Sequence, residues 1–141
     1  MTNTITNFDF FTAGKAIFTV FNNKGERYTY KIDKKPDSRN PDHFVFFVRL
    51  LTGPDNNTSY TYLGLFKPNY LEIKLGGKST YTYESKPVKV LIWALHVIHF
   101  NEAIPEGYGI IHEGKCCACG KRLTTPKSIA LGIGPECEKR M

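Results

Sequence analysis

The chain has 141 residues, of which 41% are hydrophobic, and its formal net charge is +6. A hydrophobic fraction this large excludes a disordered protein, and the length suits one domain with a small attached module. The longest apolar run, residues 88–100, is shorter than the roughly 20 residues needed to cross a bilayer and is interrupted by Lys89, His96 and His99. No secretion or lipidation signal is seen at Met1, so we expect a cytoplasmic protein with no membrane partner.

The first hundred residues predict an α+β fold with a twisted antiparallel five-stranded sheet. Alternating or continuously apolar runs predict strands at 15–21, 27–32, 44–51, 59–66 and 70–75, after a short strand or helix within residues 1–14. The run 44–51 is apolar except for Arg49, so we expect a central strand covered on both faces. The short connections predict a strongly twisted meander, in the manner of a small open barrel.

One long helix is predicted to pack on this sheet. Ser85-Lys86-Pro87 is typical of a helix start, and residues 88–100 carry an apolar stripe at helical spacing. We expect residues 1–104 to form a β-rich domain with this helix. Residues 105–141 are predicted to form a zinc-binding module packed on that domain, because the connection is too short for a tethered finger.

The four cysteines all lie in this C-terminal segment. Cys116 and Cys119 form a C-x-x-C pair followed by Gly120, the spacing of a zinc knuckle. Cys137 follows Gly134-Pro135, in the predicted first turn of a helix, where free N–H groups favour a thiolate. The alternatives are disulfides, thiol-disulfide catalysis and free buried cysteines, but a cytosolic chain without a βαβ pattern favours a metal.

A tetrahedral site needs a fourth ligand, and the candidates are His112 and Cys117. We prefer His112, because adjacent residues such as Cys116 and Cys117 point apart, whereas a histidine four residues earlier can fold back. The predicted ligand set for one structural Zn²⁺ is therefore His112, Cys116, Cys119 and Cys137. Four protein ligands leave no open position for catalysis.

Residues 116–137 follow the pattern C-x-x-C-G-[KR]-x-L-T-x-P-x-S-I-x-x-G-I-G-P-x-C, and His112 precedes it at a four-residue offset. This run resembles the zinc-binding tail of small proteins of unknown function encoded by bacteriophages and prophages. The same tail is also found on larger proteins that handle nucleic acid, so the resemblance implies a nucleic-acid role and, for a phage protein, the cytoplasm of the host bacterium.

Positive charge concentrates in the tail, where residues 115–141 hold six of the nineteen basic side chains and two of the thirteen acidic ones. Such a patch attracts phosphates, although ordinary solubilising charge is the alternative. Tyrosines of the predicted hairpins offer stacking surfaces beside two further basic residues. The candidate nucleic-acid-binding residues are Lys115, Lys121, Arg122, Lys127, Lys139, Arg140, Arg27 and Lys31.

These features favour a binding protein, since the sequence shows no nucleophile beside a base and no recognisable carboxylate pair. We expect a small phage-type accessory protein that is not an enzyme, has no evident small-molecule substrate, and binds nucleic acid or a nucleoprotein complex. The alternative is an inhibitor of a host protein, such as a defence protein or a takeover target, in which zinc is only a structural scaffold.

Overall fold

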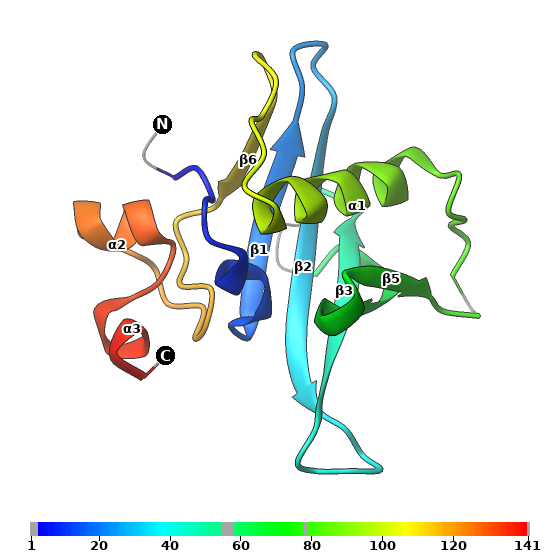
Figure 1. Ribbon diagram of the computed structural model, residues 1–141, viewed down its shortest axis with the longest axis horizontal. Helices are drawn as coiled ribbons and strands as arrows, with labels where there is room; N and C mark the ends of the chain where they lie inside the picture. The colour runs from blue at the N-terminus through cyan, green and yellow to red at the C-terminus, as the bar shows by residue number, and fades with distance from the viewer. Residues whose placement is uncertain (1–2, 55–57, 78, 141) are drawn as a thin grey trace.

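The computed structural model describes residues 3–54, 58–77 and 79–140 and has an α+β fold (Figure 1). Its elements are, in chain order, η1 (Phe8–Thr12), β1 (Lys15–Phe21), β2 (Arg27–Pro36), β3 (Phe44–Leu51), β4 (Tyr60–Lys67), η2 (Pro68–Tyr70), β5 (Glu72–Leu75), α1 (Lys86–His99), β6 (Gly109–His112), α2 (Pro126–Leu131) and α3 (Pro135–Arg140). The strands of the described residues form one open sheet in the order β5-β4-β3-β2-β1-β6, with every neighbouring pair antiparallel.

β1 and β2 form a hairpin whose turn is held by Asn22. The Asn22 N–H donates to the Glu26 carbonyl at 3.0 Å, and its Oδ1 accepts from the N–H groups of Lys24 and Glu26 at 2.9 and 3.1 Å. Asparagine side chains stabilise turns in this way, and Gly25 supplies a left-handed residue with a φ of 84°. The hairpin is therefore specified by local sequence, as predicted.

α1 is the predicted long helix and crosses one face of the sheet in front of β1 and β2 (Figure 1). Pro87 lies in its first turn, a position that tolerates the missing N–H. Tyr30, fully buried on β2, donates its hydroxyl to the Pro87 carbonyl at 2.6 Å. The buried side of α1 repeats at helical spacing and consists of Val88, Leu91, Ala94, Leu95, Val97 and Ile98.

β3 is covered on one face only, so the expectation of cover on both faces is wrong. Val48 and Leu50 are buried on the side that faces α1, whereas Phe47 and Arg49 on the other side are only half-buried. A run of apolar residues does not reveal whether a second layer of structure exists to cover it. The uncovered side, here called the open face, carries Thr29, Lys31, Phe47, Arg49, Tyr60 and Tyr62.

The sheet contains a sixth strand, β6, beyond the five predicted from the sequence. It pairs with β1, placing Ile110 opposite Val20 and His112 opposite Phe18. Four residues are too few to show a reliable alternation, and the partner strand lies almost a hundred residues earlier. Because β6 belongs to the sheet, the predicted boundary after residue 104 separates one strand from the domain to which it is hydrogen-bonded.

The N-terminal segment pairs with the outer edge of β6. Ile5 donates its N–H to the Ile110 carbonyl at 2.9 Å, and η1 then places Phe10 and Phe11 in the core. The Phe11 ring meets the Phe18 ring of β1 at 4.8 Å between centroids in an edge-on arrangement. This segment is thus the short helix on the sheet, one of the two forms expected for it.

Candidate metal centre and basic hollow

Two of the cysteines are presented by a tight turn directly after β6. The Cys116 N–H donates to the Lys121 carbonyl at 2.7 Å, and the Gly120 N–H donates back to the Cys116 carbonyl at 2.9 Å. Gly120 adopts a φ of 81°, the left-handed conformation that glycine accepts without strain. This turn explains the C-x-x-C-G spacing, because it brings the Cys116 and Cys119 thiols to one side.

The third cysteine arrives through two short helices. The Thr125 side chain caps α2 by accepting the Ser128 N–H at 3.2 Å, and Gly132 ends α2 with a φ of 73°. α3 then starts at Pro135 and carries Cys137 in its first turn. The sulfur atoms of Cys116, Cys119 and Cys137 all lie within 4.8 Å of one another, a spacing at which one metal ion can contact all three.

Backbone N–H groups point at the Cys116 sulfur. Ala118 and Gly134 donate to it at 3.4 and 3.3 Å. Burial works against ionisation of this thiol, but the N–H groups around the sulfur outweigh burial and lower the pKa of Cys116 to about 7. The sequence could not reveal these backbone donors, because a pattern of side chains does not show which N–H groups will point at a given sulfur atom.

Cys137 shows the opposite shift. Burial, followed by hydrogen bonds that the Cys137 thiol makes to the sulfur atoms of Cys119 and Cys116, raises the pKa of Cys137 to about 11. Thiolates held this close repel one another, so the remaining protons leave readily only when a cation takes their place. The three sulfur atoms are soft donors, and the lowered pKa of Cys116 already favours one thiolate. Such a donor set fits a thiophilic divalent metal.

His112, the predicted fourth ligand, lies apart from this group. Its Nδ1 accepts the Gly114 N–H at 2.9 Å and its Nε2 is hydrogen-bonded to the Ile129 carbonyl, so both ring nitrogens already have backbone partners. The ring is buried and stacks on Phe10 at 6.0 Å between centroids. The structure therefore differs from the predicted ligand set, because β6 turns His112 toward the core.

Cys117 also lies outside the three-thiol group. Its carbonyl accepts the Lys15 N–H at 2.6 Å, and its own N–H donates to the Gly132 carbonyl at 2.9 Å. Burial raises the pKa of Cys117 to about 12, as expected for an inert thiol. Cys117 thus joins the tail to β1 through its backbone.

A basic hollow of about 540 Å³ lies where the tail meets the sheet. Arg27 at the start of β2 lines it together with Lys115 and Arg122, which face each other across the knuckle turn. Glu113 is the one acidic side chain among its lining residues. The structure thus brings together three of the predicted nucleic-acid-binding residues from segments ninety positions apart.

The other candidate basic residues are dispersed. Lys121 lines a separate hollow beside the cysteines, while Lys127 and Lys139 are exposed elsewhere on the tail. Lys31 lies on the open face, with its Nζ 5.6 Å from the centre of the Tyr60 ring. The side chain of Arg140 lies outside the part of the chain that the structure describes.

The tyrosines divide between the two faces of the sheet. Tyr30 is fully buried under α1, and Tyr28 lies on the same side. Tyr60 and Tyr62 lie on the open face, half-buried, and Tyr62 is opposite Arg49. Strand alternation predicts that Tyr28 and Tyr30 share a face, but only the position of α1 shows that this face is closed.

The fold and the thiol group define a small α+β protein with a cysteine-rich tail that is compatible with metal binding. Residues 111–141 match DUF6011, a family of unknown function. The match starts at Ile111 in β6 and includes all four cysteines. No curated protein matches the chain, and neither does any solved structure. Within the described residues, α1 and the shorter helices lack the length and apolarity needed to span a membrane.

Proposed function

We propose that the protein binds nucleic acid, and that a zinc ion held by Cys116, Cys119 and Cys137 keeps the binding surface in shape. Three sulfur donors suit zinc, and such an ion has no redox role of its own. Zinc would cross-link the knuckle turn to α3 and so fix the position of Lys115 and Arg122. The chain's own contribution is the preformed turn and the N–H groups around Cys116.

The basic hollow is the observation that carries this proposal. Arg27, Lys115 and Arg122 converge on one concave surface with a single carboxylate, Glu113. Like charges this close repel one another and do not stabilise the fold. Their convergence therefore favours the binding of an anionic partner. A phosphate backbone offers regularly spaced anions for such a surface.

The open face beside the hollow favours single strands over a duplex. Tyr60 and Tyr62 of β4 are half-buried there, and the Lys31 Nζ of β2 lies 5.6 Å from the centre of the Tyr60 ring. Arg49 of β3 lies opposite Tyr62 and is paired with Asp33 at 2.8 Å. Unpaired bases stack on aromatic rings while cations follow the backbone, an arrangement used by many single-strand-binding sheets. A duplex hides its bases from such a surface.

Fluorescence anisotropy with labelled single-stranded and duplex oligonucleotides tests the proposal. We expect single strands to bind more tightly, with affinity that falls steeply as salt rises. Arg122→Ala and Arg27→Ala should each weaken binding about three- to tenfold, as expected for the loss of one phosphate contact. Lys89→Ala is the matched control, because Lys89 lies on α1 across the sheet from the hollow.

Three outcomes would contradict the proposal. Affinity that does not depend on salt argues against phosphate contacts, and equal losses for Arg122→Ala and Lys89→Ala argue against the hollow. Capture of a stoichiometric protein from nuclease-treated host lysate, with no oligonucleotide binding, favours inhibition of a host protein instead.

A further inference from the structure

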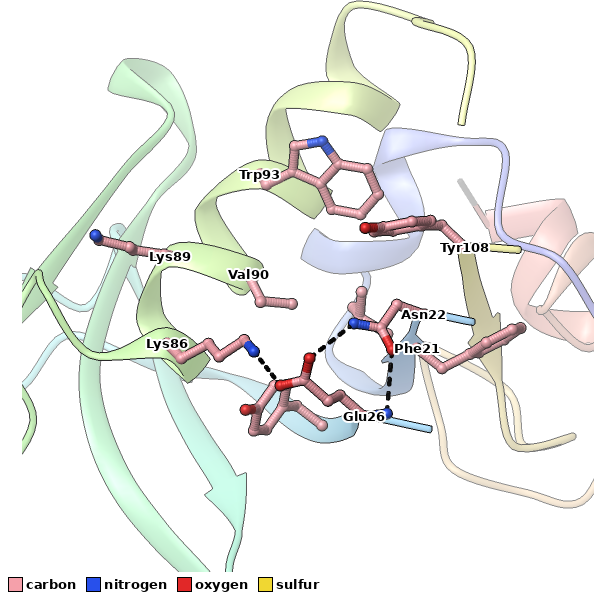
Figure 2. Close-up of a pocket in the computed structure, with 10 residues that line it drawn as sticks. Phe21, Asn22, Glu26, Lys86, Lys89, Val90, Trp93 and Tyr108 are labelled. Carbon is pink, nitrogen blue, oxygen red and sulfur yellow. Dashed lines mark hydrogen bonds and ion pairs between the residues drawn. The ribbon is translucent and has the colours of Figure 1, made fainter. Parts of the chain in front are cut away.

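A second cavity lies between α1 and the β1–β2 hairpin, and it shares no lining residue with the basic hollow. Its volume is about 340 Å³, within the range of small-molecule sites. Figure 2 shows Val90 and Trp93 of α1 facing it from one side, and Tyr108, which precedes β6, facing it from the other. Neither the metal centre nor the proposed nucleic-acid surface uses this cavity.

Aromatic rings form much of the cavity wall. The Trp93 and Tyr108 rings approach edge to face at 5.8 Å between centroids, and Phe21 and Tyr28 of the hairpin complete the wall. Tyr108 is 40% exposed and Trp93 is half-buried, although rings of this size usually gain stability from full burial. Flat apolar walls of this kind favour a flat aromatic ligand.

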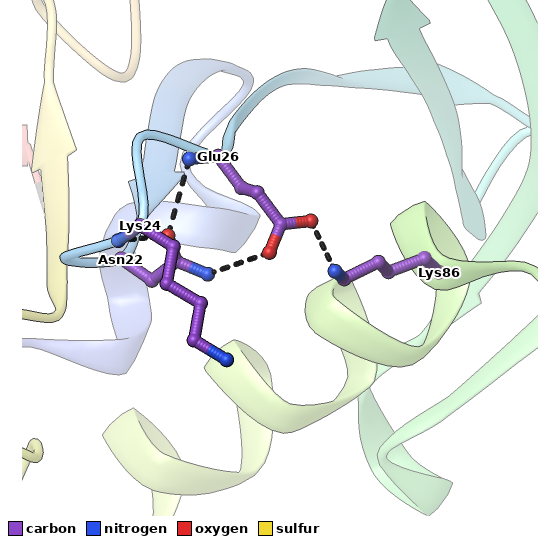
Figure 3. A network of polar contacts seen from close by, with 4 residues as sticks. All are labelled: Asn22, Lys24, Glu26 and Lys86. Carbon is purple, nitrogen blue, oxygen red and sulfur yellow. Dashed lines mark hydrogen bonds and ion pairs between the residues drawn. The ribbon is translucent and has the colours of Figure 1, made fainter.

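The polar groups of the cavity gather at one end, around Glu26 (Figure 3). One carboxylate oxygen of Glu26 accepts from Asn22 Nδ2 at 3.1 Å, and the other pairs with the Lys86 amine. The hydrogen bond from Lys86 is the main reason that the pKa of Glu26 is lowered. Both oxygens of this carboxylate therefore already have partners.

Three residues that line the cavity carry hydrogen-bond donors, namely Lys86, Tyr28 and Tyr108. The Lys86 amine lies within electrostatic reach of the hydroxyl groups of Tyr28 and Tyr108, besides its pair with Glu26. Within the described part of the chain, neither tyrosine hydroxyl has a hydrogen-bond partner in the protein. An ammonium group and two uncommitted hydroxyls suit a carboxylate or phosphate.

The local charge also favours an anion over a cation. Lys24 adds a second positive charge near Glu26, so two lysines face one carboxylate. Lys89 is balanced by Glu84 at 3.6 Å, and Figure 2 shows its side chain directed away from Glu26. An aromatic-lined site for an ammonium ligand needs an excess of negative charge, which is not found here.

We propose that this cavity binds a flat aromatic molecule that carries a carboxylate or a phosphate. The ring lies against Trp93 and Tyr108, and the anionic group is held by Lys86 and the hydroxyls of Tyr28 and Tyr108. Two sources share this chemistry, namely aromatic carboxylates and nucleoside monophosphates. The inference does not depend on the proposed nucleic-acid function, because it concerns different residues.

Trp93 is the single tryptophan of the chain, so its fluorescence reports on this cavity alone. The full-length protein is titrated with 2-naphthoate, with adenosine monophosphate and with (2-naphthylmethyl)trimethylammonium, and each titration is repeated by calorimetry to exclude optical artefacts. We expect at least one anion to give a saturable change in Trp93 fluorescence, and the anion that does so identifies the source. The ammonium probe should bind at least tenfold more weakly than 2-naphthoate.

Lys86→Gln should weaken binding of the anion at least tenfold, and Tyr108→Phe about threefold. Lys127→Gln should leave it unchanged, since Lys127 is exposed on the tail and does not line this cavity. If Lys86→Gln disturbs the far-ultraviolet circular dichroism, Tyr108→Phe decides the question. The proposal is overturned if neither anion binds, if the ammonium probe binds as tightly, if both lysine variants behave alike, or if calorimetry shows binding that leaves Trp93 fluorescence unchanged.

Discussion

Cys116 is the residue on which the candidate metal centre depends most. Its sulfur accepts two backbone N–H groups, and the knuckle turn is closed by its own N–H and carbonyl. Cys137 contributes a thiol from a separate helix and needs a cation to lose its proton readily. The site is therefore partly preformed by the backbone.

Metal content of single variants tests which residues are ligands. We expect Cys116→Ser, Cys119→Ser and Cys137→Ser each to lose most of the bound metal, as measured by mass spectrometry of the purified protein. Cys117→Ala and His112→Ala should keep one ion per chain, because both residues lie outside the three-thiol group. If His112→Ala loses the metal while its circular dichroism spectrum, and hence its fold, is unchanged, His112 is a ligand.

Gly132 is a second residue with a clear physical requirement. Its φ is 73°, and a Cβ at this position would lie 3.0 Å from the Phe10 ring and 3.3 Å from the His112 ring. We expect Gly132→Ala to lower the free energy of unfolding by about 1–3 kcal/mol in urea denaturation. Gly77→Ala is the control, because a Cβ there meets nothing within 4 Å. An equal loss of unfolding free energy in this variant would show that the φ of Gly132 and its close neighbours are not the cause.

Among the elements, η1 links the sheet to the tail. Phe10 is 4% exposed, its ring stacks on the ring of His112, and a Cβ at Gly132 would lie 3.0 Å from it. β6 joins the same region from the sheet side through its pairing with β1. The tail therefore packs against two elements, η1 and β6, that are about a hundred residues apart in sequence. It is not an independent module joined by a flexible linker.

Truncating Phe10 tests this support. Phe10→Ala should cost about 3–5 kcal/mol of unfolding free energy, the usual range for a buried phenylalanine, and should speed release of the metal to a chelator. Phe44→Ala, at a position that is 51% exposed, should cost less than about 1 kcal/mol. Faster metal release from Phe44→Ala than from Phe10→Ala would count against the linkage of η1 to the tail.

At the scale of the whole molecule, metal binding should depend strongly on pH. The pKa of Cys137 is raised to about 11, so its thiol is protonated at neutral pH until a metal displaces the proton. Cys116, with a pKa of about 7, also becomes protonated as the pH falls below neutrality. Metal binding therefore releases protons, and its contribution to stability is lost on the acidic side.

Competition with a chromogenic chelator measures this dependence. Apparent metal affinity should fall about tenfold per pH unit for each proton displaced, and more steeply below pH ~7 than above it. Chelation at constant pH should raise amide hydrogen exchange in residues 113–140 and leave β2 and β3 protected. An affinity that is constant from pH ~8 to ~6 would exclude thiol ligands.

Local sequence determined the five consecutive antiparallel strands, the β1–β2 turn and the long helix. Each of these depends on side chains within a few positions of one another, such as Asn22 with Lys24 and Glu26. The spacing of Cys116 and Cys119 is equally local, because one turn sets it. The place of Cys137 in the first turn of a helix was also predicted from local sequence, but its approach to the other two thiols depends on how α2 and α3 fold back on the knuckle turn.

Only the tertiary structure decided which face each residue occupies and which distant residues meet. β6 places His112 opposite Phe18 on the covered side of the sheet, so its ring packs on Phe10 and its nitrogens bind backbone groups of the tail. The meeting of Arg27 with Lys115 and Arg122, and that of Trp93 with Tyr108, follow from the same nonlocal packing. Periodicity along a chain records which side of a strand a residue lies on, but it holds no information about what will cover that side.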